Sequence, residues 1–415
     1  MIHRTCRICS SDLPASFLDL GEQPLANNLL SDPADPPSRF PLAMTKCRAC
    51  HLVQLTEVVP PDLLFGEYLY TPSQSTFFKE HFEAMAKTLE EKTSLHGGDL
   101  VVDVGSNDGT LLSYFQRDGM RIVGVEPARN LALAARNEGI PTLARYFSDD
   151  TVTLILQDYG HPMLITATNV CAHVSDILSF GREVARLLDE EGVFVVETPS
   201  LAIMLRDGLF DTAYHEHLST WSLHTLRAAF VRCGLKAYDV EEVASHGGSL
   251  RVYFDKGVRR PMERLRVALD GEQINEGSYA GLMDHARLTR HKMKSYLLER
   301  KGSVVAGYTS PAKATVLLNY CGLTGDDISY IVDDSPLKRG KWLPTSGKPI
   351  PIVGFERFES EPPDIVLLNA WNLKAELASK LRSHGVHGEL VVPLPNFEIM
   401  RAVYAKREDA APTFP

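Results

Sequence analysis

No apolar run in this 415-residue chain approaches the ~20 residues that a membrane-spanning helix needs. The first residues, Met1 to Cys6, are not followed by the apolar core of a signal peptide. Basic charge is also scarce, since 43 Lys and Arg face 53 Asp and Glu, a formal net charge of −10. Nucleic-acid binding depends largely on basic side chains that contact phosphates. We therefore expect a cytoplasmic protein with neither a membrane nor a nucleic acid among its partners.

Short apolar segments alternate with amphipathic helical segments from residue 98 onward. Such alternation is typical of a parallel sheet with helices on both faces. The segments 237–243 and 250–254, joined by a short loop with two glycines, should form an antiparallel edge of the same sheet. The predicted parallel strands are 100–104, 121–125, 163–167 and 193–197.

Two further parts flank this unit. Residues 1–70 are rich in proline and lack helical periodicity, and a helix is predicted over 74–94. A helical stretch near 272–300 leads into a second alternating unit, which predicts a smaller α/β domain. Its predicted strands are 303–308, 328–332, 365–368 and 390–392. The predicted domains are 1–70, 71–257 and 258–415.

Four of the seven cysteines form two tight pairs near the N-terminus. Each pair encloses two residues, which places both thiolates on one side of a turn, and two such turns complete a tetrahedral site for Zn²⁺. Because four ligands leave no open position, this zinc ion would be structural. Four unrelated cysteines or a redox pair are the alternatives, and the adjacent His51 is not expected to bind. The predicted ligands are Cys6, Cys9, Cys47 and Cys50.

A turn with two glycines follows the first predicted strand, over residues 101–110. It does not have the G-x-G-x-x-G pattern of dinucleotide-binding folds. A pyrophosphate needs closely packed backbone amides, whereas S-adenosylmethionine (SAM) has no phosphate and needs acceptors for its ammonium group. Asp103 and Asp108 could accept such donors, and Gly105 would let the backbone approach the ligand. The predicted cofactor contacts in this turn are Asp103, Gly105, Ser106, Asn107, Asp108 and Gly109.

Two more positions strengthen the prediction of SAM. Glu126, followed by Pro127, ends the second strand, where a carboxylate can accept both ribose hydroxyls of an adenosine. Asn169 follows the third strand and is placed to contact the methionyl part. These positions favour SAM over the alternative, a nicotinamide-dependent dehydrogenase with a degenerate turn.

The densest group of reactive side chains lies in the segment 211–217, Asp-Thr-Ala-Tyr-His-Glu-His. One interpretation is a catalytic dyad in which Glu216 orients His217 as a general base, since the ordinary pKa of histidine lies near neutral pH. The alternatives are a metal site at His215 and His217, or a structural hydrogen-bond cluster. His173 lies at the carboxyl edge of the sheet, where ligands bind in such folds.

Several longer motifs carry a resemblance to a known family, and it covers nearly the full length. They are the two CxxC pairs with residues 21–27 (GEQPLAN), 103–109 within VDVGSNDG, Asn169-Val170 with Ala172-His173, 214–217 (YHEH), 246–253 (HGGSLRVY), 317–320 (LLNY), 333–338 (DDSPLK) and Trp371-Asn372. The chain resembles the three-domain sugar C-methyltransferases of deoxysugar pathways, which act on nucleotide-linked, typically dTDP-linked, 4-keto sugars. The resemblance implies a zinc-binding module, a central class I Rossmann-like SAM methyltransferase domain and a C-terminal Rossmann-like α/β domain.

The resemblance also implies a mechanism. His217, with Glu216 as its partner, would remove the proton at C3 beside the ketone, and the enolate would accept the methyl group of SAM with inversion. Tyr68, His173 and Tyr214 would surround the sugar and steady the enolate oxygen. The implied substrate contacts are Tyr70, Lys313, Asn319 and Lys338. A monomer would suffice for this reaction.

The chain departs from the family in one loop of the C-terminal domain. Thr309-Ser310 stands where the family has Gly-Ala, and Ala314-Thr315 where it has Gly-Asn. These bulkier residues bear on which nucleotide and sugar are used. Rival functions are a methyltransferase for another small molecule, an RNA- or protein-modifying methyltransferase that grips a polymer with its zinc module, and a non-catalytic nucleotide-sugar binding protein.

Overall fold

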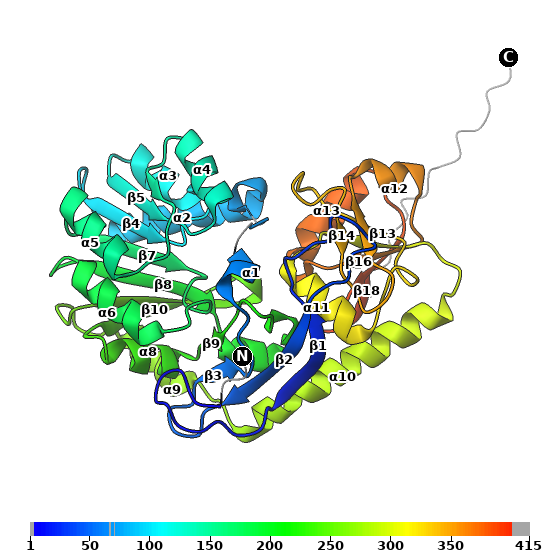
Figure 1. Cartoon of the computed structure of the whole chain (residues 1–415), viewed down its shortest axis with the longest axis horizontal. Helices are drawn as coiled ribbons and strands as arrows, with labels where there is room; N and C mark the ends of the chain where they lie inside the picture. Colours follow the sequence, from blue (N-terminus) through cyan, green and yellow to red (C-terminus); the bar gives the residue numbers. More distant parts are fainter. Residues whose placement is uncertain (1–3, 66–67, 70, 401–415) are drawn as a thin grey trace, which may run out of the picture.

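The computed structural model describes residues 4–65, 68–69 and 71–400, and it contains three sheets (Figure 1). The N-terminal sheet has the order β1-β2-β3-β9, with every neighbouring pair antiparallel. Its strands are β1 (Leu18–Pro24), β2 (Arg39–Lys46), β3 (Val53–Leu55) and β9 (Ser219–Thr220). The sequence patterns predicted none of these strands. The last strand, β9, comes from the central part of the chain and lies outside the predicted module of residues 1–70.

The central sheet has the order β10-β11-β8-β7-β4-β5-β6. Strands β8 to β6 are parallel, whereas β10 and β11 form the predicted antiparallel edge. The predicted bounds of β4 and β5 match the structure, and the other predicted strands differ by one or two residues. The strands are β4 (Leu100–Val104), β5 (Arg121–Val125), β6 (Thr142–Leu143), β7 (Leu164–Thr168), β8 (Val193–Pro199), β10 (Lys236–Val243) and β11 (Ser249–Asp255).

Helices cover both faces of this sheet, as the all-buried strand β4 requires. Successive side chains of a strand point to opposite faces. Val101 accordingly packs with Met85 of α2 and Phe115 of α3, whereas Val102 packs in a separate cluster with Phe180 of α6. The helices of this part are α1 (Pro61–Phe65), α2 (Thr76–Thr93), α3 (Thr110–Arg117), α4 (Arg129–Asn137), α5 (Asp149–Asp158), α6 (Ile177–Leu187), α7 (Leu201–Asp207), α8 (Leu223–Val231) and α9 (Glu263–Gly271).

The C-terminal sheet has the order β14-β15-β13-β12-β16-β17-β18, with a parallel centre and an antiparallel strand at each edge. The chain leaves β12 first toward β13 and later returns to its other side with β16, which makes β12 the point where the strand order reverses. Ligands bind at such points in open α/β sheets. The strands are β12 (Val305–Tyr308), β13 (Tyr330–Val332), β14 (Trp342–Leu343), β15 (Ile350–Val353), β16 (Ile365–Leu368), β17 (Glu389–Val392) and β18 (Glu398–Met400).

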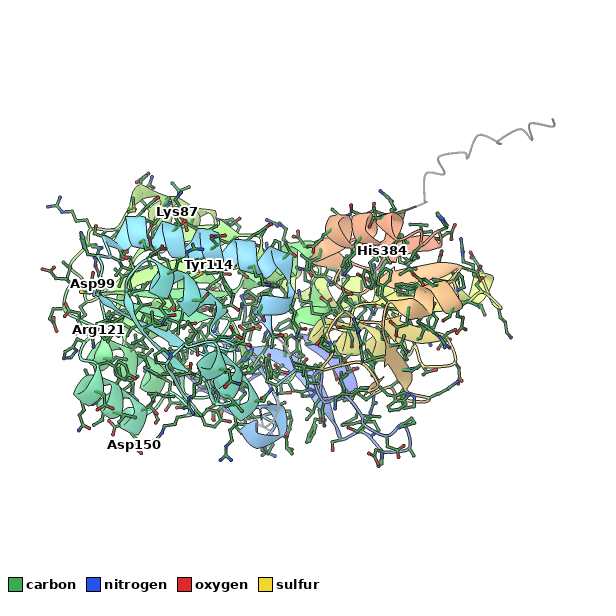
Figure 2. The ribbon with its side chains drawn as sticks, turned by 90° about the horizontal axis from the view of Figure 1, so that it is seen from above. Lys87, Asp99, Tyr114, Arg121, Asp150 and His384 are labelled. Carbon is green, nitrogen blue, oxygen red and sulfur yellow. The ribbon has the colours of Figure 1, made fainter. Side chains whose placement is uncertain are left out.

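Helix α10 (Glu276–Glu299) lies between the central and C-terminal sheets in the sequence, and it runs beneath β1, β2 and the C-terminal part (Figure 1). It packs against α7, β1 and α11 (Ala312–Cys321), so it touches all three parts of the fold. Two further helices, α12 (Glu356–Ser360) and α13 (Lys374–Ser383), belong to the C-terminal part. Exposed polar side chains such as Lys87, Asp150 and His384 point outward at the periphery (Figure 2). Within the described residues, no helix combines the length and the apolar character needed to cross a bilayer.

Candidate active site and zinc site

The four predicted zinc ligands converge although 37 residues separate their pairs in the sequence. The Sγ atoms of Cys6 and Cys50 lie 3.4 Å apart, those of Cys9 and Cys47 lie 3.5 Å apart, and all four lie within 4.8 Å of one another. Zn–S bonds of about 2.3 Å would place tetrahedral sulfurs about 3.8 Å apart, so the cluster fits Zn²⁺. Among the described residues it is the only group of three or more potential metal ligands.

A cavity of about 1050 Å³ lies where the three parts of the fold meet. Its walls include Asn27 from the N-terminal part, Glu126 and His217 from the central part, and Lys313 from the C-terminal part. A pocket for one small molecule measures roughly 300–1000 Å³. The cavity is therefore at the upper end of this range.

The half of the cavity next to the central sheet contains the predicted cofactor residues. The carboxylate of Glu126 accepts hydrogen bonds from the backbone N–H groups of Asn107 (2.9 Å) and Ala128 (2.8 Å), which fix it at the end of β5. Asp103 accepts one from the Thr166 hydroxyl at 2.6 Å, and burial raises the pKa of Asp103 to about 7. Both carboxyl groups are thus held in place before a ligand arrives.

Gly105 and Asn169 allow close contact with a ligand in this half. Gly105 has φ +69°, and a Cβ atom there would lie 2.5 Å from Cγ2 of Val170. Asn169 also has a left-handed φ, +60°, and its backbone N–H donates to the Glu197 carbonyl at 2.7 Å. Its side-chain Oδ1 is buried and has no hydrogen-bond partner among the described residues. An orphaned acceptor at this position fits the ammonium group of SAM.

The remaining predicted cofactor residues divide between two roles. Ser106, Asn107, Asp108 and Pro127 line the cavity, but Gly109 does not. Gly109 is the N-cap of α3 with φ +79°, and a Cβ atom there would meet Ile140 at 3.0 Å. The structure gives Gly109 a role in the tight turn and its packing, and its contact with the cofactor stays a prediction.

His217 lies in the middle of the cavity wall with a fixed ring orientation. Its Nδ1 lies 2.8 Å from the carbonyl oxygen of Thr212, which can only accept, so Nδ1 carries the proton and Nε2 is the basic nitrogen. The ring centroid lies 3.9 Å from that of Tyr214 and 5.2 Å from that of His173. Burial, followed by the neighbouring His173, lowers the pKa of His217 well below 6.5, which keeps the imidazole neutral at pH 7.

Glu216 does not orient His217, so this predicted pairing is wrong. Its Oε1 accepts a hydrogen bond from Asn27 at 2.6 Å and its Oε2 accepts one from the Tyr68 hydroxyl at 3.0 Å. The two neighbouring side chains diverge within the turn, and the Thr212 carbonyl takes the orienting role. Burial raises the pKa of Glu216 to about 7. Glu216 instead connects the N-terminal part to Tyr68 at the cavity wall.

The other members of the 211–217 segment point to different parts of the fold. The carboxylate of Asp211 is buried and accepts a hydrogen bond from Nε1 of Trp371 at 2.7 Å. Nε2 of His215 lies 3.2 Å from the Phe40 carbonyl, on the side of the N-terminal sheet. His215 and His217 therefore do not form a metal site. Within the segment 211–217, the residues that line the cavity are Thr212, Tyr214, Glu216 and His217.

His173, Tyr68 and two predicted substrate residues also line the cavity. Burial lowers the pKa of His173 to about 4, so this ring is neutral as well. Nζ of Lys313 donates to the His246 carbonyl at 2.5 Å and lies 4.6 Å from the Trp371 ring centroid. Nζ of Lys338 donates to the Ser310 carbonyl at 2.8 Å. Both lysines reach the cavity from the C-terminal part.

Asn319, a predicted substrate contact, does not line the cavity. Its Nδ2 donates instead to the carbonyls of Thr315 and Pro344, each at 2.9 Å. Tyr70, another predicted substrate contact, lies outside the described residues.

His246, which had no predicted role of its own, lies in the loop between β10 and β11 and lines the cavity. Burial and the nearby Lys313 lower its pKa to about 3. The adjacent Ser245 donates to the buried carboxylate of Glu197 at 2.6 Å, which also accepts from Arg251 at 2.8 Å. The sequence feature that could have indicated a role for His246 is its position near a strand end, directly before two glycines.

Comparison with protein families and with a characterised relative agrees with this arrangement. A zinc binding domain model matches residues 6–65, a methyltransferase domain model matches 77–240, and a C-methyltransferase C-terminal domain model matches 244–395. The chain is 35% identical over 410 residues to the C-methyltransferase NovU of Streptomyces niveus. The alignment covers 96% of this chain and 97% of that protein.

Two solved structures of methyltransferases are similar to less than half of the chain. The magnesium protoporphyrin IX methyltransferase ChlM of Synechocystis PCC 6803 with bound SAM is 13% identical, with a TM-score of 0.33, over 42% of this chain and 78% of that one. A SAM-dependent methyltransferase from Clostridium acetobutylicum is 14% identical, with a TM-score of 0.36, over 43% of this chain and 92% of that one.

Proposed function

Because this chain belongs to the family of SAM-dependent C-methyltransferases, with a zinc-binding N-terminal domain, we propose that it methylates C3 of a nucleotide-linked 4-keto deoxysugar. In this proposal the nucleotide is dTDP, the protein acts in the cytoplasm, and a monomer carries out the reaction. The observation that carries the proposal is a neutral, oriented imidazole, that of His217, in a cavity that also holds the cofactor residues.

His217 is the general base of the proposed reaction. Its Nε2 takes the proton from C3, and the electrons of the C–H bond move toward the ketone oxygen to give an enolate. The Thr212 carbonyl holds the Nδ1 proton and stabilises the imidazolium that forms. When bound, SAM supplies the electrophilic methyl group that the enolate carbon accepts. A positioned base of this kind contributes about 10²–10⁴-fold to the rate.

Tyr214, His173 and Tyr68 surround the position of the enolate oxygen in this proposal. All three line the cavity, and the rings of Tyr214 and His173 lie next to that of His217. A neutral imidazole carries one N–H group, so His173 can donate a hydrogen bond at pH 7. One preorganised donor to a developing oxyanion is worth about 3–4 kcal/mol.

The carboxyl edge of the C-terminal sheet is the proposed site of the nucleotide diphosphate. Lys313 and Lys338 supply positive charge there, next to the reversal of strand order at β12. The hydroxyl groups of Thr309, Ser310 and Ser335 are buried at the same edge and have no hydrogen-bond partner in the described part of the chain. A buried hydroxyl group without a hydrogen-bond partner costs about 1–3 kcal/mol. In this proposal the phosphate oxygens of the substrate accept the missing hydrogen bonds.

Solvent deuterium exchange tests the proposal. The protein is incubated in D₂O with a dTDP-linked 4-keto-6-deoxyhexose and S-adenosylhomocysteine, and exchange at C3 is followed by NMR. We expect exchange with the wild-type protein, a product heavier by one methylene when SAM is supplied, and loss of both with His217→Asn. Full exchange with His217→Asn would refute the role of His217, and an absence of SAM binding in calorimetry would favour a non-catalytic sugar-nucleotide binding protein.

A further inference from the structure

An arginine inside the first zinc turn reaches the segment that carries His217. Arg7 lies between Cys6 and Cys9, and its Nη1 donates to the carbonyl of Leu218 at 2.5 Å. Its Nη2 donates to the carbonyl of Leu55 at 3.3 Å. These contacts join the zinc turn to the end of β3 and to the residue that directly follows His217, 211 positions away from Arg7.

The backbone around Leu218 is held from two sides. The Leu218 carbonyl also accepts a hydrogen bond from the backbone N–H of Leu55 at 3.0 Å, and the next two residues form β9, which pairs with β3. The N–H of Ser219 donates to the Ala172 carbonyl at 3.1 Å, next to His173. The backbone that directly follows His217 is thus hydrogen-bonded to the zinc-binding part on one side and to the residue before His173 on the other.

The second zinc turn offers a comparison within the same molecule. Arg48 follows Cys47 as Arg7 follows Cys6, but its side chain is exposed and makes no hydrogen bond with any residue that the structure describes. An arginine at this position therefore does not by itself serve the metal site. Of these two arginines, Arg7 is the partly buried one, and its guanidinium group donates to two carbonyls.

We propose that Arg7 is a positioning residue for proton abstraction, which fixes the His217 segment against the zinc turn. The inference rests on the proposed role of His217 as the base. Proton transfer needs a donor–acceptor distance within roughly 3 Å, and a misplacement of about 1 Å can cost about 100-fold in rate. Without the guanidinium group, the Leu218 carbonyl keeps only the Leu55 contact, and the backbone that carries His217 loses its link to the zinc turn.

Three variants test this inference. Arg7→Met removes the donors but keeps an apolar stem, Arg7→Lys restores one cationic donor, and Arg48→Met is the matched control. The measurements are C3 deuterium exchange with the dTDP-linked 4-keto-6-deoxyhexose, kcat, the KM for SAM, the zinc content and the melting temperature. Exchange separates proton abstraction from methyl transfer, and the zinc content reports the metal site without reference to activity.

We expect Arg7→Met to lower exchange and kcat by about 10- to 100-fold, with one zinc per chain and a KM for SAM within about twofold of wild type. Arg7→Lys should recover part of the loss, and Arg48→Met should behave as wild type. If wild type itself shows no exchange, the proposed function fails and not only the role of Arg7.

Two results would overturn the role of Arg7 while wild type exchanges normally. The first is exchange by zinc-loaded Arg7→Met or Arg7→Lys at the wild-type rate. The second is an equal fall in exchange and SAM affinity, which indicates a general loss of structure. Should Arg7→Met not fold, zinc-loaded Arg7→Lys decides alone. Its one ammonium nitrogen cannot occupy the positions of both Nη1 and Nη2, so a reduced exchange rate is required.

Discussion

Replacement of Glu216 by glutamine separates two arrangements of the active site. In the structure, Glu216 accepts hydrogen bonds from Asn27 and Tyr68, while the Thr212 carbonyl orients His217. A glutamine in this place keeps one acceptor and turns an NH₂ group toward the other donor. The mismatch costs about 1–3 kcal/mol, because one buried donor loses its partner. If that energy is lost only in the transition state, the rate of C3 exchange falls by about 5- to 150-fold.

A much larger effect is expected if Glu216 orients the imidazole, as the sequence pattern suggested. Replacement of the aspartate that orients histidine in serine proteases lowers kcat by about 10⁴-fold. The assay compares C3 exchange for wild type, Glu216→Gln and His217→Asn at pH 7.5, with the KM for SAM as a control for folding. A loss of 10⁴-fold in Glu216→Gln, equal to that in His217→Asn, would contradict the arrangement in which Thr212 alone orients the ring.

Three further outcomes follow from the structure. In Glu216→Gln, which lacks the carboxyl group whose pKa burial raises to about 7, exchange should stay constant from pH 8 down to 6.5, because the neutral base form of His217 persists until its lowered pKa is reached. The assay uses saturating S-adenosylhomocysteine, so that protonation of Asp103, whose pKa is also about 7, does not change cofactor occupancy; a midpoint at 6.5 or above would then contradict this prediction. Gly105→Ala should weaken SAM binding by more than about tenfold in calorimetry, since the left-handed φ costs about 1–2 kcal/mol and the new Cβ meets Val170; the double variant with Val170→Ala should recover only part of the affinity. Cys47→Ser should lower both the zinc content and the melting temperature, whereas Cys233→Ser, at a buried thiol outside the cluster, should keep one zinc per chain.

The placement of the predicted SAM contacts in the cavity was accessible from the sequence because it follows local rules. A buried strand followed by a glycine turn, and an acidic residue at the end of the next strand, predicted the positions of Asp103, Gly105 and Glu126 in the cavity. Parallel strands end at one edge of their sheet, so the order of elements along the chain fixes which residues meet there. The same holds for the zinc ligands, since each CxxC turn places two thiolates together.

The active-site partners depended on contacts between distant segments. Glu216 pairs with Asn27, 189 residues away, and with Tyr68, 148 residues away. The residues around Glu216 in the sequence do not show that it pairs with these distant side chains and not with the adjacent His217. The sequence also did not predict the pairing of β9 with β3, because a two-residue strand has too few side chains to show a period.

The sequence alone determined the alternation of strands and helices, the metal ligands and the cofactor turn, because side-chain periodicity and turn chemistry act over a few residues. Only the tertiary structure decided which group orients His217, which side chains of the 211–217 segment share the cavity, and where Arg7 and Asn319 point. Those choices depend on burial and on hydrogen-bond geometry, and both arise only when the three sheets pack against one another.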